Sequence, residues 1–171
     1  MGKVNFLKDK CSKHHNTNCQ KILKDKDFGI CDDDSYPHAY ADTANPDKWL
    51  APVNNEAEIP VIFIPVDKSL NILKDDGTTQ STCDSILQYE NNIVFIELKD
   101  KTPPWISKAI DQLKNTIRIF DDNHGLNQFK KRRAFAANKK ESDYAYNLQD
   151  VMDDFKRETH VRLIIEVTIK I

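Results

Sequence analysis

The hydrophobic pattern along the chain becomes regular from Ile59 onward. An apolar run rich in β-branched residues, Ile59 to Val66, has the composition of a buried strand. Two further strand-sized segments, 83–90 and 93–99, flank Asn91 and Asn92, a pair that tolerates the positive φ angles of a tight turn. We therefore predict three antiparallel strands in this part of the chain, with Asn91 and Asn92 as the turn between the last two.

The later part of the chain alternates between helical and extended periodicity. Apolar residues recur at helical spacing from Ile106 to Phe120, and Gly125 stands where a left-handed residue would end that helix. A strand with a basic end follows at 130–137, and a second amphipathic helix covers 148–155. Residues 161–171 alternate between apolar and polar positions, which predicts one further strand.

Residues 1–58 lack this regularity. They contain an acidic run, Asp32 to Asp34, and favour only short helices around 19–23 and from Pro46 to Leu50. The order of elements predicts an α/β fold in which an irregular N-terminal extension, residues 1–58, packs on a core, residues 59–171. The core is expected to be one mixed β-sheet flanked by α-helices.

Composition excludes several functional classes. The 171 residues include 25 Lys and Arg against 27 Asp and Glu, a formal charge of −2, so nucleic-acid binding would need a local basic patch. The four glycines are too dispersed for a dinucleotide-binding turn or a P-loop. No apolar run approaches the roughly 20 residues of a spanning helix, and no apolar signal segment follows Met1. We therefore expect a cytoplasmic protein that does not span a membrane.

The candidate chemistry lies in the hairpin between residues 84 and 99. With Asn91–Asn92 as the turn, Asp84 is expected opposite Lys99, and side chains of Asp84, Glu97 and Lys99 share one face of the sheet. Two carboxylates can hold Mg²⁺ or Mn²⁺ and leave coordination positions for water and a phosphate oxygen. A neighbouring ammonium group can orient that water and stabilise the charge of the transition state. The simpler alternative is a salt-bridged, solvent-exposed face of a hairpin.

These residues resemble the PD-(D/E)XK, or restriction-endonuclease-like, nuclease superfamily. Asp84 is followed after 13 positions by Glu97-Leu98-Lys99 in an apolar strand, and then by an amphipathic helix that contains Gln112. The resemblance extends over roughly residues 59–171. It implies a restriction-endonuclease-like fold, hydrolysis of phosphodiester bonds in DNA, Asp84 and Glu97 as ligands of Mg²⁺ or Mn²⁺, Lys99 as the residue that assists the attacking water, and Gln112 as a further residue of the site. It also implies a role in microbial defence or nucleic-acid processing.

Two features depart from the pattern of that family. Cys83 stands where the family name has proline, and the usual glutamate-bearing helix has no clear counterpart. Glu56 and Glu58 are the nearest acidic candidates for that role. An inactive nuclease-fold module that binds a protein or nucleic acid is therefore an alternative. Separately, we expect the protein to act as a homodimer or with a partner protein.

A basic stretch supplies the local positive charge that DNA binding requires. Lys130, Lys131, Arg132 and Arg133 are followed closely by Lys139 and Lys140. Such a cluster is typical of contacts to the phosphate backbone. The alternative is an exposed strand edge that its charges keep soluble.

A third interpretation concerns the cysteines and histidines near the N-terminus. The residues concerned are Cys11, His14, His15, Cys19 and Cys31. They are of the types that bind zinc, although their spacing matches no standard finger. A zinc-stabilised interaction protein is thus a third functional hypothesis.

Overall fold

The computed structural model describes residues 4–7, 20–100, 104–139 and 148–171. They form a mixed α/β structure whose larger sheet has six strands in the order β1-β5-β6-β7-β8-β9. Strands β1, β5, β6 and β7 are antiparallel neighbours, whereas β8 and β9 continue the sheet in parallel. The three predicted antiparallel strands and the basic strand are confirmed. The bounds of the six strands are β1 Lys21–Leu23, β5 Val61–Pro65, β6 Ser85–Tyr89, β7 Asn92–Lys99, β8 Lys131–Asn138 and β9 Arg162–Ile164.

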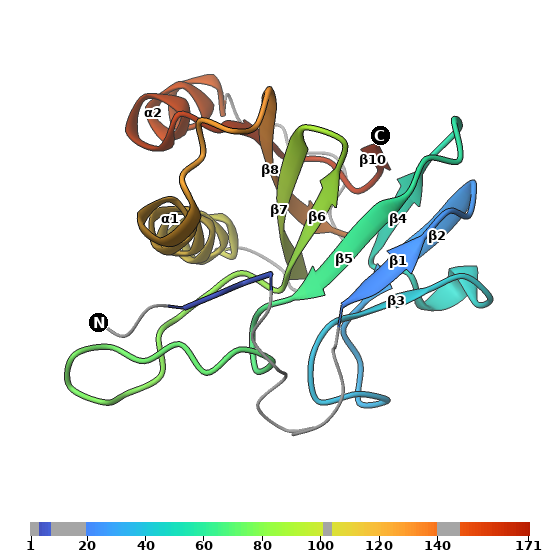
Figure 1. The fold of residues 1–171 in the computed structure, drawn as a ribbon, viewed down its shortest axis with the longest axis horizontal. Helices are drawn as coiled ribbons and strands as arrows, with labels where there is room; N and C mark the ends of the chain where they lie inside the picture. The colour runs from blue at the N-terminus through green and yellow to red at the C-terminus, as the bar shows by residue number, and fades with distance from the viewer. Residues whose placement is uncertain (1–3, 8–19, 101–103, 140–147) are drawn as a thin grey trace.

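A second sheet of four strands covers one face of the first (Figure 1). Its order is β10-β4-β2-β3, with bounds β10 Ile169–Lys170, β4 Ala51–Asn54, β2 Asp27–Cys31 and β3 Tyr40–Asp42. The expectation of an irregular N-terminal extension is therefore wrong, because residues 1–58 contain the four strands β1, β2, β3 and β4. Strand β1 also stands where a short helix was expected, whereas a 3₁₀ helix, Pro46–Lys48, does begin at the proline.

The predicted single strand over 161–171 is also wrong. Its first part, β9, pairs with β8 in the six-stranded sheet, while its last part, β10, pairs with β4 in the other sheet. The chain therefore crosses from one sheet to the other at residues 165–168. Both strands alternate with the same period of two, so the hydrophobic pattern does not reveal the interruption.

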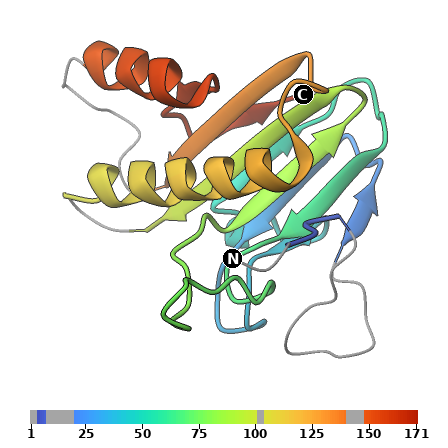
Figure 2. The ribbon, with the colours of Figure 1, turned by 60° about the vertical axis from the view of Figure 1, so that its left-hand side comes forward.

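Both helices lie on the face of the six-stranded sheet that the second sheet leaves open (Figures 1 and 2). Helix α1 spans Ile106–His124 and helix α2 spans Gln149–Thr159, as their periodicity predicts. Gly125 follows α1 with a φ of 76°, the positive angle that favours glycine. The helices thus flank the sheet on one side only. No helix among the described residues is both long and apolar enough to cross a membrane.

Strand β7 is buried on both faces, which explains its nearly continuous apolar sequence. Ile93 and Phe95 contribute to the core beneath the helices. Val94, Ile96 and Leu98 contribute to the core between the two sheets. The same alternation places the polar residues at positions 97 and 99, at the end of β7, on the face toward α1.

Candidate functional site

The strand ends that carry the predicted site residues meet at one edge of the six-stranded sheet. Strand β6 begins directly after Asp84, and its antiparallel neighbour β7 ends with Glu97, Leu98 and Lys99. The predicted turn is wrong, because Tyr89 pairs with Asn92 and leaves residues 90 and 91 in the turn. Ser85 therefore pairs with Ile96, which places Asp84 level with Glu97 rather than with Lys99.

This difference of two residues preserves the face on which each side chain lies, because side chains alternate with period two. Asp84 and Glu97 thus lie closer together than the expected diagonal. The backbone N–H of Leu98 donates a hydrogen bond of 2.6 Å to Asp84 Oδ2. That bond ties the carboxylate of Asp84 directly to the strand that carries Glu97 and Lys99.

A chain of polar contacts connects β7 to helix α1. The Lys99 ammonium group is in direct contact with Glu97 Oε1, and it donates a hydrogen bond of 3.0 Å to Gln112 Oε1. The Gln112 amide in turn donates a hydrogen bond of 2.9 Å to the Thr82 carbonyl oxygen. Gln112 is therefore oriented at both ends of its amide, and it holds the ammonium group beside the carboxylate. The structure brings all four residues predicted at the site, Asp84, Glu97, Lys99 and Gln112, into one place.

Burial dominates the electrostatics of the two carboxyl groups. Glu97 is only 1% exposed, and its Oε2 is buried without a hydrogen-bond partner among the described residues. Burial, reinforced by the charge of Asp84, raises the pKa of Glu97 to about 9 despite the nearby Lys99. Burial likewise raises the pKa of Asp84 to about 7, although the hydrogen bond from Leu98 opposes this shift. Hydrogen bonds and the nearby positive charge therefore do not stabilise the ionised form of either carboxyl group enough for it to be fully ionised near neutral pH.

The site opens into a cleft of about 480 Å³. Besides the four predicted residues, its walls include three acidic side chains and two lysines. The charged residues added by the structure are Asp32, Asp67, Lys68, Asp100 and Lys108. Neither Glu56 nor Glu58, the acidic candidates from the sequence, lines this cleft.

Asp67 was missed in the sequence, although it lies only two residues after the end of β5. The backbone N–H of Val66 donates a hydrogen bond of 2.9 Å to the Asp84 carbonyl oxygen, so Asp67 and Asp84 lie at the same sheet edge. Burial raises the pKa of Asp67, and its charge is one of those that raise the pKa of Asp84. The signal was available, because an acidic residue at the end of one predicted strand lies near the start of its antiparallel neighbour.

The donor set is compatible with a divalent cation that is held by few protein ligands. No group of three or more His, Cys, Asp or Glu side chains in the described parts of the chain is arranged to hold a metal ion. Two carboxylates do meet at the cleft, and Glu97 Oε2 is a buried oxygen that lacks a partner. Asp84 and Glu97 would therefore be the residues that hold Mg²⁺ or Mn²⁺, with water and substrate oxygen completing the shell.

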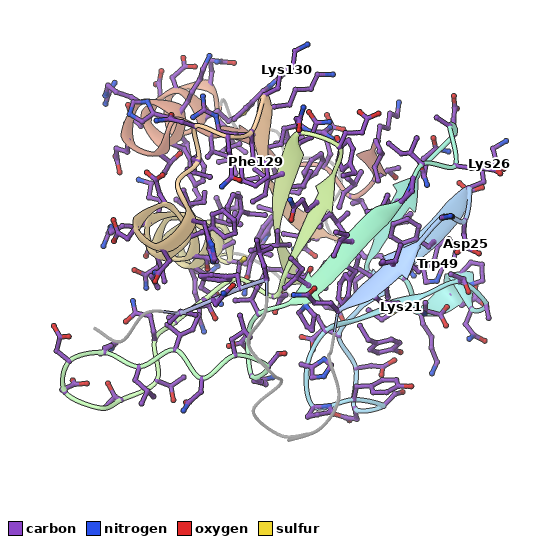
Figure 3. All side chains as sticks on the ribbon, viewed as in Figure 1. Lys21, Asp25, Lys26, Trp49, Phe129 and Lys130 are labelled. Atoms are coloured by element: carbon purple, nitrogen blue, oxygen red, sulfur yellow. The ribbon has the colours of Figure 1, made fainter. Side chains whose placement is uncertain are left out.

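None of the described residues of the basic stretch lines the cleft, and Lys140 lies outside the described residues. Lys131 pairs with Asn92, five residues before Glu97 on β7, which corresponds to about 17 Å along the strand. Lys130 lies at the upper end of the six-stranded sheet in Figure 3, whereas β7 ends at the lower edge in Figure 1. Arg133 has a structural role, because its guanidinium group donates to the Lys170 carbonyl oxygen at 2.8 Å and to the Tyr89 hydroxyl. It thereby links the two sheets.

The structure describes only one of the five residues proposed to bind zinc. Cys11, His14, His15 and Cys19 lie outside the described residues. Cys31 is a free, buried cysteine, and burial raises the pKa of its thiol to about 11. A protonated, buried thiol behaves as a small apolar group rather than as a reactive one.

Comparison with known proteins leaves the chain without an assigned family. No family model matches it, and neither the curated proteins nor the solved structures contain a significant match. The geometry of the cleft therefore carries the functional conclusion.

Proposed function

We propose that the protein is a metal-dependent nuclease that hydrolyses phosphodiester bonds in DNA and has a restriction-endonuclease-like core. The observation that carries this proposal is the convergence of Asp84, Glu97 and Lys99 at one sheet edge, with Glu97 Oε2 buried and unpartnered. The resemblance of the motif to PD-(D/E)XK nucleases supports the same assignment. Mg²⁺ or Mn²⁺ is the proposed cofactor.

The described residues would divide the chemistry among them. Asp84 is positioned by the Leu98 N–H, and Glu97 offers its free oxygen, so these two residues would bind the cation. A bound divalent cation lowers the pKa of water and stabilises negative charge on a phosphoryl oxygen. Lys99, held by Gln112, would orient the attacking water and stabilise the charge that develops in the transition state.

The charge of the cleft indicates why such a reaction would depend on the cation. Five carboxyl groups line the cleft, at positions 32, 67, 84, 97 and 100, against three lysines at positions 68, 99 and 108. A polyanionic substrate is disfavoured there unless some of the negative charge is neutralised. A strand of DNA that also contacts the basic stretch would have to extend about 17 Å along the sheet from Glu97.

Cleavage assays on purified protein test the proposal. Linear duplex DNA, circular single-stranded DNA and RNA would be incubated with Mg²⁺, with Mn²⁺ and with EDTA. Glu97→Gln and Lys99→Gln should each reduce cleavage by about 100-fold or more, because they remove a ligand or a charge aimed at the transition state. Glu90→Gln, an exposed position in the turn of the same hairpin, and Lys26→Gln, labelled far from the helices in Figure 3, should leave the rate unchanged.

Cleavage that persists in EDTA, or that the Glu97 and Lys99 variants retain, would refute the metal-dependent site. Cleavage of RNA but of neither DNA substrate would support the metal-dependent mechanism with RNA in place of DNA as the substrate.

A non-catalytic binding module with the same fold is the second candidate. The observation that favours it is the direct contact between the Lys99 ammonium group and Glu97 Oε1, which occupies one of the two oxygens of Glu97 without a metal ion. DNA binding by wild type in Mn²⁺, with no cleavage of any of the three substrates, would support this candidate instead. The cytoplasmic setting and a homodimer or partner protein belong to both versions of the proposal.

A further inference from the structure

A second cavity lies where the chain crosses from the six-stranded to the four-stranded sheet. It has a volume of about 470 Å³ and shares no lining residue with the cleft. Its walls come from β8, β9, α2 and the segment that leads into β10. A volume of this size is within the range of pockets that hold small organic molecules.

The cavity is positively charged, in contrast to the cleft. Arg133, Arg162 and Lys170 line it, against a single carboxylate, Glu166. The formal charge of the lining is therefore +2. Arg162 and Lys170 are exposed, whereas Arg133 is half-buried between the sheets.

Arg133 carries the strongest indication of a missing anionic partner. Two nitrogens of its guanidinium group donate to neutral acceptors, the Lys170 carbonyl oxygen and the Tyr89 hydroxyl. Its Nε is buried and has no hydrogen-bond partner among the described residues. Within the described part of the chain, no carboxylate forms an ion pair with it. The charge of Arg133 therefore has no anionic partner among the described residues, and an anion in the cavity that its guanidinium group lines would supply that opposite charge.

The remaining wall of the cavity is apolar. The Arg133 guanidinium carbon lies 5.6 Å from the centroid of the Phe135 ring. The other apolar lining residues are Leu148, Met152, Ile164 and Ile165. A ligand that fits both walls therefore combines an anionic group with an apolar or aromatic one.

We propose that this cavity binds a small phosphomonoester whose organic part is apolar or aromatic. A phosphomonoester carries a charge of about −1.5 to −2 near neutral pH and three strong acceptor oxygens, which matches the +2 lining and its several donors. Its organic part occupies the wall formed by Phe135 and the aliphatic residues. The site is independent of the proposed nuclease reaction, because the two cavities have no residue in common.

Calorimetric titration with phenyl phosphate tests this proposal, with inorganic phosphate and phenol as separate probes. All titrations contain EDTA, so that the outcome does not depend on metal binding in the cleft. Phenyl phosphate should bind at least about tenfold more tightly than either fragment, since it alone reaches both walls. The double variant Arg162→Gln/Lys170→Gln should weaken its binding by about tenfold or more, because it removes two cationic donors that can form charge-assisted hydrogen bonds to the phosphate group.

Both replaced side chains are exposed, so the double variant should fold, which circular dichroism verifies. Lys24→Gln/Lys156→Gln is the matched control, because both of these lysines are exposed and neither lines the cavity. It should bind phenyl phosphate as wild type does. Absence of binding by wild type at millimolar concentration, equal binding by the folded double variant, or equal affinity for inorganic phosphate would each overturn the proposal.

Discussion

Replacing Glu97 by glutamine should make the stability of the protein less dependent on pH. Burial raises the pKa of Glu97 from its ordinary value to about 9 in the folded protein. The folded state therefore retains a proton that the unfolded state has already released, and the free energy of unfolding falls as pH rises between the two pKa values. Glutamine carries no titrating proton and removes this contribution.

The expected magnitude follows from the two pKa values. A difference of one unit corresponds to about 1.4 kcal/mol, so Glu97 should lower the free energy of unfolding by about 3 kcal/mol between about pH 6 and about pH 8. Asp84, with a pKa of about 7, has the same sign and should add about 1 kcal/mol over that interval. Wild type should thus lose about 4 kcal/mol, and Glu97→Gln only about 1 kcal/mol.

Urea unfolding followed by tryptophan fluorescence measures this difference, because Trp49 and Trp105 are both buried. The measurements need EDTA at both pH values, and Glu90→Gln, an exposed glutamate on the same hairpin, is the control that should follow wild type. Mg²⁺ should then restore stability to wild type more strongly at the higher pH, where ionising the carboxyl groups costs less. If Glu97→Gln loses as much stability as wild type between the two pH values, Glu97 is not the buried proton carrier inferred from the structure.

Two further predictions concern other parts of the molecule. Asp42→Ala should lower the free energy of unfolding by about 1–3 kcal/mol in urea titrations, because it leaves the Trp49 indole N–H, 2.9 Å from Asp42 Oδ2, without its acceptor. An unchanged midpoint would show that this hydrogen bond contributes nothing net. Neutralising Lys131 and Arg132 should reduce the slope of log K against log salt by roughly 0.9 for each phosphate of duplex DNA that the protein no longer neutralises. Fluorescence anisotropy in Ca²⁺ measures that slope, and an unchanged value would assign both residues to a solvent-exposed sheet edge.

The elements that the sequence predicted correctly are those whose own apolar pattern identifies a buried face. Strands β5, β6 and β7 and helix α1 are long enough for that pattern to repeat. The turn was wrong because Asn91 and Asn92 tolerate positive φ, yet Glu90 adopts the positive value of 46°. Pairing with β8 extends β7 back to Asn92, and this is a long-range contact that the hairpin sequence alone does not contain. The prediction that Asp84 and Glu97 lie on one face remains correct, because a shift of two residues in strand register leaves every side chain on the same face of the sheet.

The second sheet could not be predicted for a related reason. Strands of two to five residues are too short to display a period, and β10 pairs with β4 although more than 100 positions separate them. The packing of Trp49 over Gly29 is similarly tertiary, since a Cβ at Gly29 would overlap the indole ring. Such contacts depend on how the two sheets pack against each other. This packing also determines which acidic residues outside the Asp84, Glu97 and Lys99 motif line the cleft.

Glu97 is the residue at which local stability and the proposed function oppose each other. Its strand is apolar on both faces, and an aliphatic side chain at this position would avoid the cost of burying a carboxyl group with an unpartnered oxygen. A salt bridge to Lys99 offsets only part of that cost, because the pKa of Glu97 remains raised to about 9. Positions that violate the rule of buried polar satisfaction are concentrated at functional sites. A divalent cation that supplies the missing positive charge would convert this unfavourable carboxyl group into a ligand, so the destabilisation measured without metal and the affinity for metal should decline together in Glu97→Gln.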